Sequence, residues 1–472
     1  MKIRRLIAAI TVPMMLGLPA FAESNDESRY FEVLTNYAAN LYINEEITSD
    51  DLMREATEAV LKDNPELMYK MIKAAFRSLD DYSEFYTAEE YKEYYQRLNK
   101  IFYGMGVVVQ RRDNEVVIMR LFDGGGAKAA GIQEGDILLE VDSKLVQEMS
   151  LEEITATASG EEGTFVNVKI RRGESVLDFN VERRKVEDTT VSGAVLPADI
   201  GYIEILSFAE GTPAEFGMVL ESFAEKNVTN IILDLRNNPG GMLSSVIEVA
   251  QQIVPAGIIT QTIYRNELEN ETFYSELADA KYNFAVLVNE ETASAAEVLT
   301  GALQDSGVGY VIGETTYGKG VIQNVFNLKT GDAFKITTGH YLTRNGNDIN
   351  GEGIEPNETV TNSRRPIDLS KYETFDYATK WHVGESGKGV LAAKQRLTVM
   401  GYYHGEINEY FDAALEKAVY SFQEEVGLYP YGVLDLSTQA TMENKFYIIE
   451  VTVDDQFYAA YEYLGGKLED LE

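Results

Sequence analysis

A serine and a lysine, at positions 294 and 319, are the residues of this chain whose types could do chemistry together. Ser294 lies in TASAAEV (residues 292–298), shortly after the apolar run FAVLVN, so we expect it where a strand leads into a helix. The first backbone N–H groups of a helix are unpaired and can hold an oxyanion beside a nucleophilic serine. The N–H of Ala295 would be such a donor. The same position also suits a serine that only caps the helix.

A nucleophilic serine needs a base, and the chain has three histidines: His340, His382 and His404. His340 falls in a strand-like run without an acid at a telling spacing, and the other two lie in or beyond a linker. Lys319, in GETTYGKGVIQ, is the alternative base, because desolvation lowers the pKa of a lysine and frees its neutral amine. Gln323 could orient that amine or the serine hydroxyl by hydrogen bonding.

Lys319 has two competing interpretations. Residues 313–319 fit the G-x-x-x-x-G-K pattern of a phosphate-binding loop, but Gly320 stands where the loop needs Ser or Thr. A strand-like run, VIQNVFNL, follows where phosphate binding requires a helix. Nucleotide binding is therefore disfavoured, whereas a Gly-rich turn with a solvated lysine stays open.

A second Gly-rich turn, in LDLRNNPGG (residues 233–241), follows another buried strand. Gly240 and Gly241 could aim backbone N–H groups at a substrate carbonyl and supply the other half of an oxyanion hole. An ordinary strand-to-helix turn is the alternative at this place.

The elements around these motifs change character along the chain. Apolar residues at helical spacing come first, then short β-like runs between Gly-rich turns, then strands alternating with helices, which indicates a mainly parallel α/β sheet. We therefore predict a multidomain α/β and α+β protein. Its predicted parts are a signal peptide (1–22), a helical region (23–90), a β-sandwich or barrel domain (91–187), an α/β core (188–362) with a cap insertion near 262–282, a linker (363–385), a small helical module (386–447) and a weakly structured tail (448–472).

The N-terminus predicts export. Lys2, Arg4 and Arg5 precede an apolar run, and Ala20-Phe21-Ala22 follows, which is the order of a secretory signal peptide cleaved after Ala22. A retained anchor is the alternative, but the run is shorter than the roughly 20 apolar residues of a membrane span. We therefore expect an extracytoplasmic location.

Composition narrows the function classes. The formal net charge of −36 repels phosphate backbones, so we expect no nucleic-acid partner. The chain has no cysteine, which excludes disulfides, a lipidated cysteine and thiolate zinc sites.

The motifs together resemble the carboxyl-terminal processing proteases, a serine peptidase family. LDLRNNPGG, TASAAEV, YGKGVIQ and GEGIEPN (351–357) occur in the family's order, and the likeness covers roughly residues 28–362. The resemblance implies that Ser294 is the nucleophile, that Lys319 is the base and that Gln323 supports it. It implies neither a metal nor another cofactor.

Upstream, YGMGVVV (103–109) and AAGIQEGDILLEVD (129–142) resemble a PDZ domain. By that resemblance, the backbone N–H groups of Met105, Gly106 and Val107 would bind the C-terminal carboxylate of a substrate, which would add as a strand beside them. Many relatives have an arginine just before a glycine of this domain, where TASGEEGT places Ser159. Switching by that arginine is therefore not expected here.

The C-terminal module resembles a peptidoglycan-binding domain, and Ala418, Val419 and Phe422 read as its core. Peptidoglycan is thus a candidate partner, although some homologues use the module for assembly. Dimers occur among relatives, so a homodimer is one alternative for the assembly state.

From these features we expect an exported serine endopeptidase with a Ser-Lys dyad that cuts proteins near their C-termini after its PDZ domain engages the tail. The alternative is a catalytically inactive PDZ scaffold at the cell wall. A scaffold needs neither the serine nor the lysine nor the glutamine, which favours the enzyme.

Overall fold

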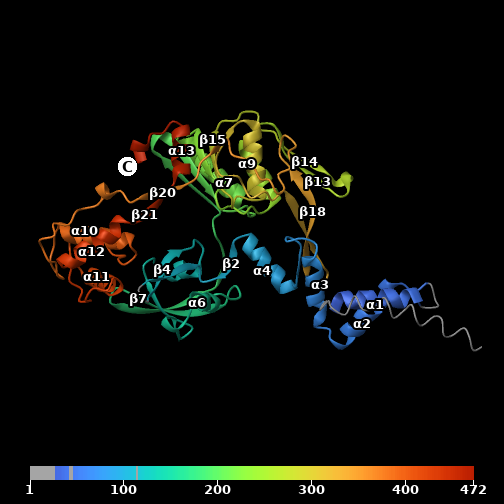
Figure 1. Ribbon diagram of the computed structural model, residues 1–472, viewed down its shortest axis with the longest axis horizontal. Helices are drawn as coiled ribbons and strands as arrows, with labels where there is room; N and C mark the ends of the chain where they lie inside the picture. Colours follow the sequence, from blue (N-terminus) through green and yellow to red (C-terminus); the bar gives the residue numbers. More distant parts are fainter. Residues whose placement is uncertain (1–26, 42–45, 113–114, 472) are drawn as a thin grey trace, which may run out of the picture. The chain divides into compact units, whose positions relative to one another are not determined.

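The structure is a computed structural model that describes residues 27–41, 46–112 and 115–471 (Figure 1). The predicted signal peptide lies outside the described residues. The chain forms two compact units, one of residues up to 95 with 322–338, the other of residues 96–321 with 339–472. Within the described ranges, no helix is both long enough and apolar enough to cross a membrane.

The first unit is mostly helical, as the apolar spacing predicts. Its helices are α1 (Glu27–Leu41), α2 (Ser49–Asp63), α3 (Leu67–Arg77) and most of α4 (Ala88–Leu98). Thr48 and Asp51 close the start of α2 with a capping box, which satisfies backbone N–H groups that the helix leaves unpaired. Strands complete the unit: β1 (Glu84–Tyr86) pairs with the first residues of β18 (Ala333–Leu342), and β17 (Val321–Asn327) also pairs with β18.

The second unit begins with a small antiparallel domain. Its sheet has the order β3–β4–β5–β7–β8, with β6 beside β5, so β3 lies at an edge. Alternate residues of the strands, such as Val116 and Ile118, are buried with Ile154 of the helix that covers them. The elements are β2 (Ile101–Gly104), β3 (Val107–Arg112), β4 (Glu115–Leu121), α5 (Gly126–Ala130), β5 (Ile137–Val141), β6 (Lys144–Leu145), α6 (Leu151–Ala158), β7 (Phe165–Arg172), β8 (Ser175–Glu182) and β9 (Arg184–Glu187).

An α/β core follows, and it carries the predicted chemistry. Its sheet has the order β10–β11–β12–β15–β16–β19; β10 is antiparallel to β11, and the other neighbours pair in parallel. The strands are β10 (Val191–Leu196), β11 (Ile200–Ile205), β12 (Asn230–Asp234), β15 (Asn283–Val288), β16 (Gly309–Gly313) and β19 (Glu358–Thr359), and the helices are α7 (Thr212–Glu225), α8 (Leu243–Ile253) and α9 (Ala295–Ser306). After their first residues, the central strands β12 and β15 are buried, which is why they read as continuous apolar runs.

The carboxyl ends of three neighbouring parallel strands carry the three predicted motifs. The turn with Gly240 and Gly241 follows β12, the segment with Ser294 follows β15, and the loop with Lys319 follows β16. Carboxyl ends of parallel strands meet at one edge, so this topology brings the motifs together. The segment predicted as a cap near 262–282 belongs mainly to an antiparallel hairpin of β13 (Gly257–Tyr264) and β14 (Glu271–Ser275).

The C-terminal tail is ordered structure, so the prediction of a weakly structured tail is wrong. Strand β21 (Glu450–Val453) pairs with β20 (Ser363–Pro366), which also gives the predicted linker a strand at its start. Helix α13 (Asp455–Tyr463) then packs on the core sheet, where Ala460 and Tyr461 are fully buried (Figure 1). The residues they pack against belong to the core strands, more than a hundred positions earlier in the sequence. A pattern within the tail therefore does not reveal this packing.

The helical module lies between β20 and β21. It contains α10 (Lys388–Val399), α11 (Ala413–Glu425) and α12 (Leu436–Tyr447). Ala418, Val419 and Phe422 are buried in its core, as predicted. The module is therefore inserted into the second unit, since the chain returns to the core sheet after it.

Candidate active site

Ser294 occupies the sharp turn between β15 and α9. It is the N-cap of α9, with φ 57° and ψ −118°, a left-handed conformation that strains a residue with a side chain. Its neighbours Ala293, Ala295 and Ala296 are buried, whereas Ser294 itself is half-buried. Ser294 thus lies on a strained turn, and it is more exposed than the alanines on both sides of it. Strain of this kind is typical of functional positions.

The two predicted halves of the oxyanion hole lie against each other. A Cβ added to Gly240 would meet the backbone nitrogen of Ala295 and the Cβ of Ser294, both at 2.8 Å, so only glycine fits there. The N–H of Gly240 donates to Asn238 Oδ1 at 2.9 Å and is therefore engaged within the turn. Of the two glycines, Gly241 is the better candidate donor. Ala295 begins the helix, so its N–H has no acceptor within α9.

Glu297 joins the serine to the lysine loop, and the sequence reasoning missed it. The residue is fully buried on α9, and each of its oxygens accepts two hydrogen bonds. Oε2 accepts the backbone N–H of Ser294 at 2.8 Å and that of Lys319 at 2.9 Å. Oε1 accepts the hydroxyl of Thr316 at 2.6 Å and the N–H of Gly318 at 2.7 Å. The Ser-x-x-Glu spacing of a capping box was the available signal.

Lys319 is half-buried in the loop between β16 and β17. The glycines on both sides are required by close packing: a Cβ on Gly318 would lie 2.8 Å from the nitrogen of Gly353, and one on Gly320 would lie 2.7 Å from that of Asn350. The hydroxyl of Tyr341 donates to the carbonyl of Lys319. The strand that follows is not the helix of a phosphate-binding loop, which agrees with the sequence-based interpretation.

Gln323 and His340 are the two further candidates from this part of the sequence. Gln323 lies on β17, in the first unit, and its amide donates to the hydroxyl of Thr337 at 3.3 Å. Its support of Lys319 stays a prediction. His340 is exposed on β18.

A buried ion-pair network underlies the turn after β12. Asp234 accepts hydrogen bonds from the Tyr202 hydroxyl at 2.8 Å and from the Arg236 side chain at 2.6–3.1 Å. Burial and the neighbouring Asp234 charge raise the pKa of Tyr202, so it stays a hydrogen-bond donor. Asp234 and Arg236 both belong to the motif LDLRNNPGG.

The predicted PDZ residues lie just before and at the start of β3. Met105 buries its side chain in the domain core, and Val107 begins the edge strand β3. Gly106 has φ 75°, and a Cβ there would lie 2.8 Å from the Cα of Gly125. Ser159 is the C-cap of α6.

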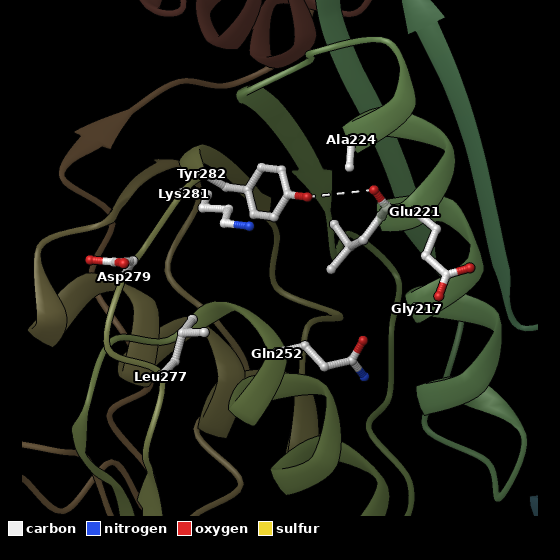
Figure 2. Close-up of a pocket in the computed structure, with 9 residues that line it drawn as sticks. Gly217, Glu221, Ala224, Gln252, Leu277, Asp279, Lys281 and Tyr282 are labelled. Carbon is white, nitrogen blue, oxygen red and sulfur yellow. Dashed lines mark hydrogen bonds between the residues drawn. The ribbon is translucent and has the colours of Figure 1, made fainter.

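A pocket in the core is separate from these residues. Figure 2 shows it between α7, α8 and the segment that leads into β15. The Tyr282 hydroxyl reaches the carbonyl of Leu220 at 3.5 Å across it. None of the predicted site residues lines this pocket.

Comparison with known proteins agrees with this arrangement of a peptidase-type core and accessory domains. Peptidase family S41 matches residues 199–360, a PDZ domain matches residues 104–182, and a putative peptidoglycan-binding domain matches residues 386–442.

Several relatives resemble most of the chain. The carboxy-terminal processing protease CtpA of Bacillus subtilis (strain 168) is 31% identical over 386 residues, covering 81% of this chain and 82% of that protein. A CtpA-like serine protease of Staphylococcus aureus (strain bovine RF122 / ET3-1) is 29% identical over 454 residues, covering 93% and 87%. The solved photosystem II D1 C-terminal processing protease is 26% identical, covers 71% of this chain and 94% of its own, and superposes with a TM-score of 0.41. The chain therefore belongs to the carboxy-terminal processing protease family, and it is a serine-type peptidase.

Proposed function

We propose that this peptidase is an exported Ser-Lys endopeptidase that binds the C-terminus of a protein substrate and cuts near it. The observation that carries the proposal is the shared acceptor: the backbones of Ser294 and Lys319 donate to the same oxygen of buried Glu297. A carboxylate in that place holds the two residues side by side. The contact of Gly240 with Ser294 and Ala295 adds an oxyanion site to the same edge.

In the proposed reaction the Ser294 hydroxyl oxygen attacks the scissile carbonyl carbon, and the neutral amine of Lys319 takes the hydroxyl proton. The carbonyl electron pair moves to oxygen, where the N–H groups of Ala295 and Gly241 stabilise the charge. The Lys319 ammonium then protonates the leaving amine as the C–N bond breaks. A water molecule, deprotonated by the same lysine, hydrolyses the resulting ester and restores the serine.

Recognition of the substrate tail is assigned to the PDZ domain. Among the strands that the structure describes, β3 pairs with β4 alone, so an extended peptide can pair with its other side. Gly106 has φ 75°, a conformation that favours glycine, and we assign the carboxylate to the backbone N–H groups of this loop. The peptidoglycan-binding-type module and the charged, apolar N-terminus support a place outside the cytoplasm, with peptidoglycan as a candidate ligand.

Lys319→Ala should lower hydrolysis of an unfolded protein at neutral pH by at least about 10³-fold, because no other group would accept the serine proton. Lys319→Arg is the matched control. It keeps the positive charge but cannot lose its proton, so it should be equally inactive. The measurement is the initial cleavage rate of both variants, with thermal unfolding followed in parallel. An arginine variant with substantial activity would contradict the assignment of Lys319 as a base.

Gly106→Ala should weaken recognition of the tail. The added methyl group meets the Gly125 backbone and disfavours φ 75°, which displaces the carboxylate-binding loop. We expect KM to rise about tenfold for a peptide with a free C-terminus, with kcat nearly unchanged. The same peptide with an amidated C-terminus should show no such difference between variant and wild type. Equal KM values for the free peptide would rule out this role of the loop.

A further inference from the structure

Arg236 is held by two segments that lie far apart in the chain. Its guanidinium pairs with Asp234, two residues earlier, at 2.6 Å, and with Asp454 of the C-terminal tail at 2.5 Å. The arginine side chain is 14% exposed and that of Asp234 is 5% exposed, whereas that of Asp454 is 43% exposed. Burial by itself lowers the pKa of Arg236, but the hydrogen bonds to the two aspartates raise it. The arginine therefore stays charged and fixed.

These contacts engage each nitrogen of the guanidinium. Nε donates to Asp234, Nη2 donates to Asp234 and Asp454, and Nη1 donates to Asp454 and to Gln456 Oε1 at 3.3 Å. The Asp454 contact is bidentate, the geometry in which a guanidinium is oriented most strongly. Without it, Asp234 and the longer contact to Gln456 would be the partners left to the guanidinium.

The turn that Arg236 begins is bonded to the segment of the candidate nucleophile. Asn237 receives a hydrogen bond from the Asn289 amide at 2.8 Å, and its N–H donates to Asn289 Oδ1 at 2.9 Å. The Thr292 hydroxyl donates to the carbonyl of Leu235 at 2.8 Å, and the Ala293 N–H donates to that of Asn238 at 2.9 Å. A shift at Arg236 would therefore move both halves of the oxyanion site.

The tail is anchored firmly enough to hold Arg236 in place. Asp455 accepts the N–H and hydroxyl of Ser363 and pairs with Arg365, which fixes the start of α13 to β20. The Tyr461 hydroxyl donates to the carbonyl of Pro197 at 3.0 Å, and its ring is fully buried. The tail is thus a fixed support and not a loose end.

We propose that Asp454 is a positioning residue for catalysis: it holds Arg236 and so sets the position of the oxyanion donors at Gly241 and Ala295. This inference rests on the proposed function. It means that residues C-terminal to the inserted helical module contribute to the peptidase site. Of the two carboxylates that pair with Arg236, one comes from the tail of the chain.

The test compares Asp454→Asn with Asp455→Asn in the full chain. Asparagine at 454 keeps an oxygen that can accept the Phe457 N–H, now 3.1 Å from Asp454 Oδ1, but loses the bidentate charge pair. We expect kcat on an unfolded protein to fall about tenfold with KM within about twofold, because misplaced oxyanion donors weaken only the transition state. Asp455→Asn weakens one contact to β20 but leaves the buried Tyr461 anchor and the Asp454–Arg236 pair in place, so it should keep kcat. Asp454→Glu should recover part of the loss.

The rates are divided by the active fraction, titrated with a fluorophosphonate, so that misfolded protein does not count. Normal kcat per active site in Asp454→Asn would overturn the inference, even if its melting temperature fell. An equal loss of kcat in both asparagine variants would also overturn it, since it would indicate general damage to the tail. Ser294→Ala run beside them separates the two ideas: if it retains cleavage, the proposed function itself fails.

Discussion

Ser294→Ala should lower cleavage of an unfolded protein substrate by at least about 10⁴-fold, because the variant has no oxygen to attack the carbonyl. The fold should survive, because alanine and serine are equally strained at φ 57° and the helix α9 still begins at Ala295. We expect the unfolding free energy to change by no more than about 1 kcal/mol. Cleavage is followed by the loss of intact substrate, and stability by thermal unfolding.

Ser306→Ala, at the other end of the same helix, is the matched control. Its hydroxyl donates to the carbonyl of Leu303, so the same atom is removed without touching the site. This variant should cleave normally. A fluorophosphonate should label the wild type and Ser306→Ala at Ser294, and leave Ser294→Ala unlabelled. Cleavage by Ser294→Ala close to the wild-type rate would place the nucleophile elsewhere.

The parts of the site that the sequence predicted are those whose signals are local. TASAAEV predicted a serine at a helix start, and the structure places Ser294 there. Strand-like runs before each motif predicted where the motifs would emerge, and β12, β15 and β16 end at those positions. The absence of a suitable histidine directed attention to Lys319. The inferences about the helix start and the strands used residues within about ten positions of each motif.

The parts that the sequence did not predict depend on partners far along the chain. Glu297 reads as one charged residue in a helix, and its role is visible only when Thr316 and Lys319 fold back onto it. Asp454 was assigned to a weakly structured tail because its partner Arg236 precedes it by more than two hundred residues. Spacing within a segment carries no information about such contacts.

A finer limit concerns the two glycines of the turn after β12. The sequence predicted both Gly240 and Gly241 as oxyanion donors. In the structure the Asn238 side chain takes the N–H of Gly240, while Gly240 is needed for its close contact with Ser294. The sequence alone does not distinguish a glycine whose N–H is available to an oxyanion from a glycine that is required by a close backbone contact.

Glu297→Gln is expected to impair both stability and catalysis. The carboxylate accepts four hydrogen bonds, two on each oxygen. In glutamine an NH₂ group replaces one of these oxygens. The two groups that donated to that oxygen then lose their acceptor and meet another donor in a buried place. The loss of charge-assisted hydrogen bonds, together with buried donors left without an acceptor, should lower the unfolding free energy by about 3–5 kcal/mol. Thermal unfolding measures this change.

Catalysis should fall as well, by about 10²-fold or more, since small displacements of reacting groups cost that much. The rate is measured below the melting temperature of the variant and divided by its active fraction, which separates misplacement from unfolding. Glu291→Gln, an exposed change in the loop before Ser294, should alter neither quantity. Glu297→Asp keeps the charge on a shorter side chain that does not reach all four donors, so its activity should lie between those of wild type and Glu297→Gln. Full activity in a destabilised Glu297→Gln would mean that Glu297 holds the fold together without aligning the serine and the lysine.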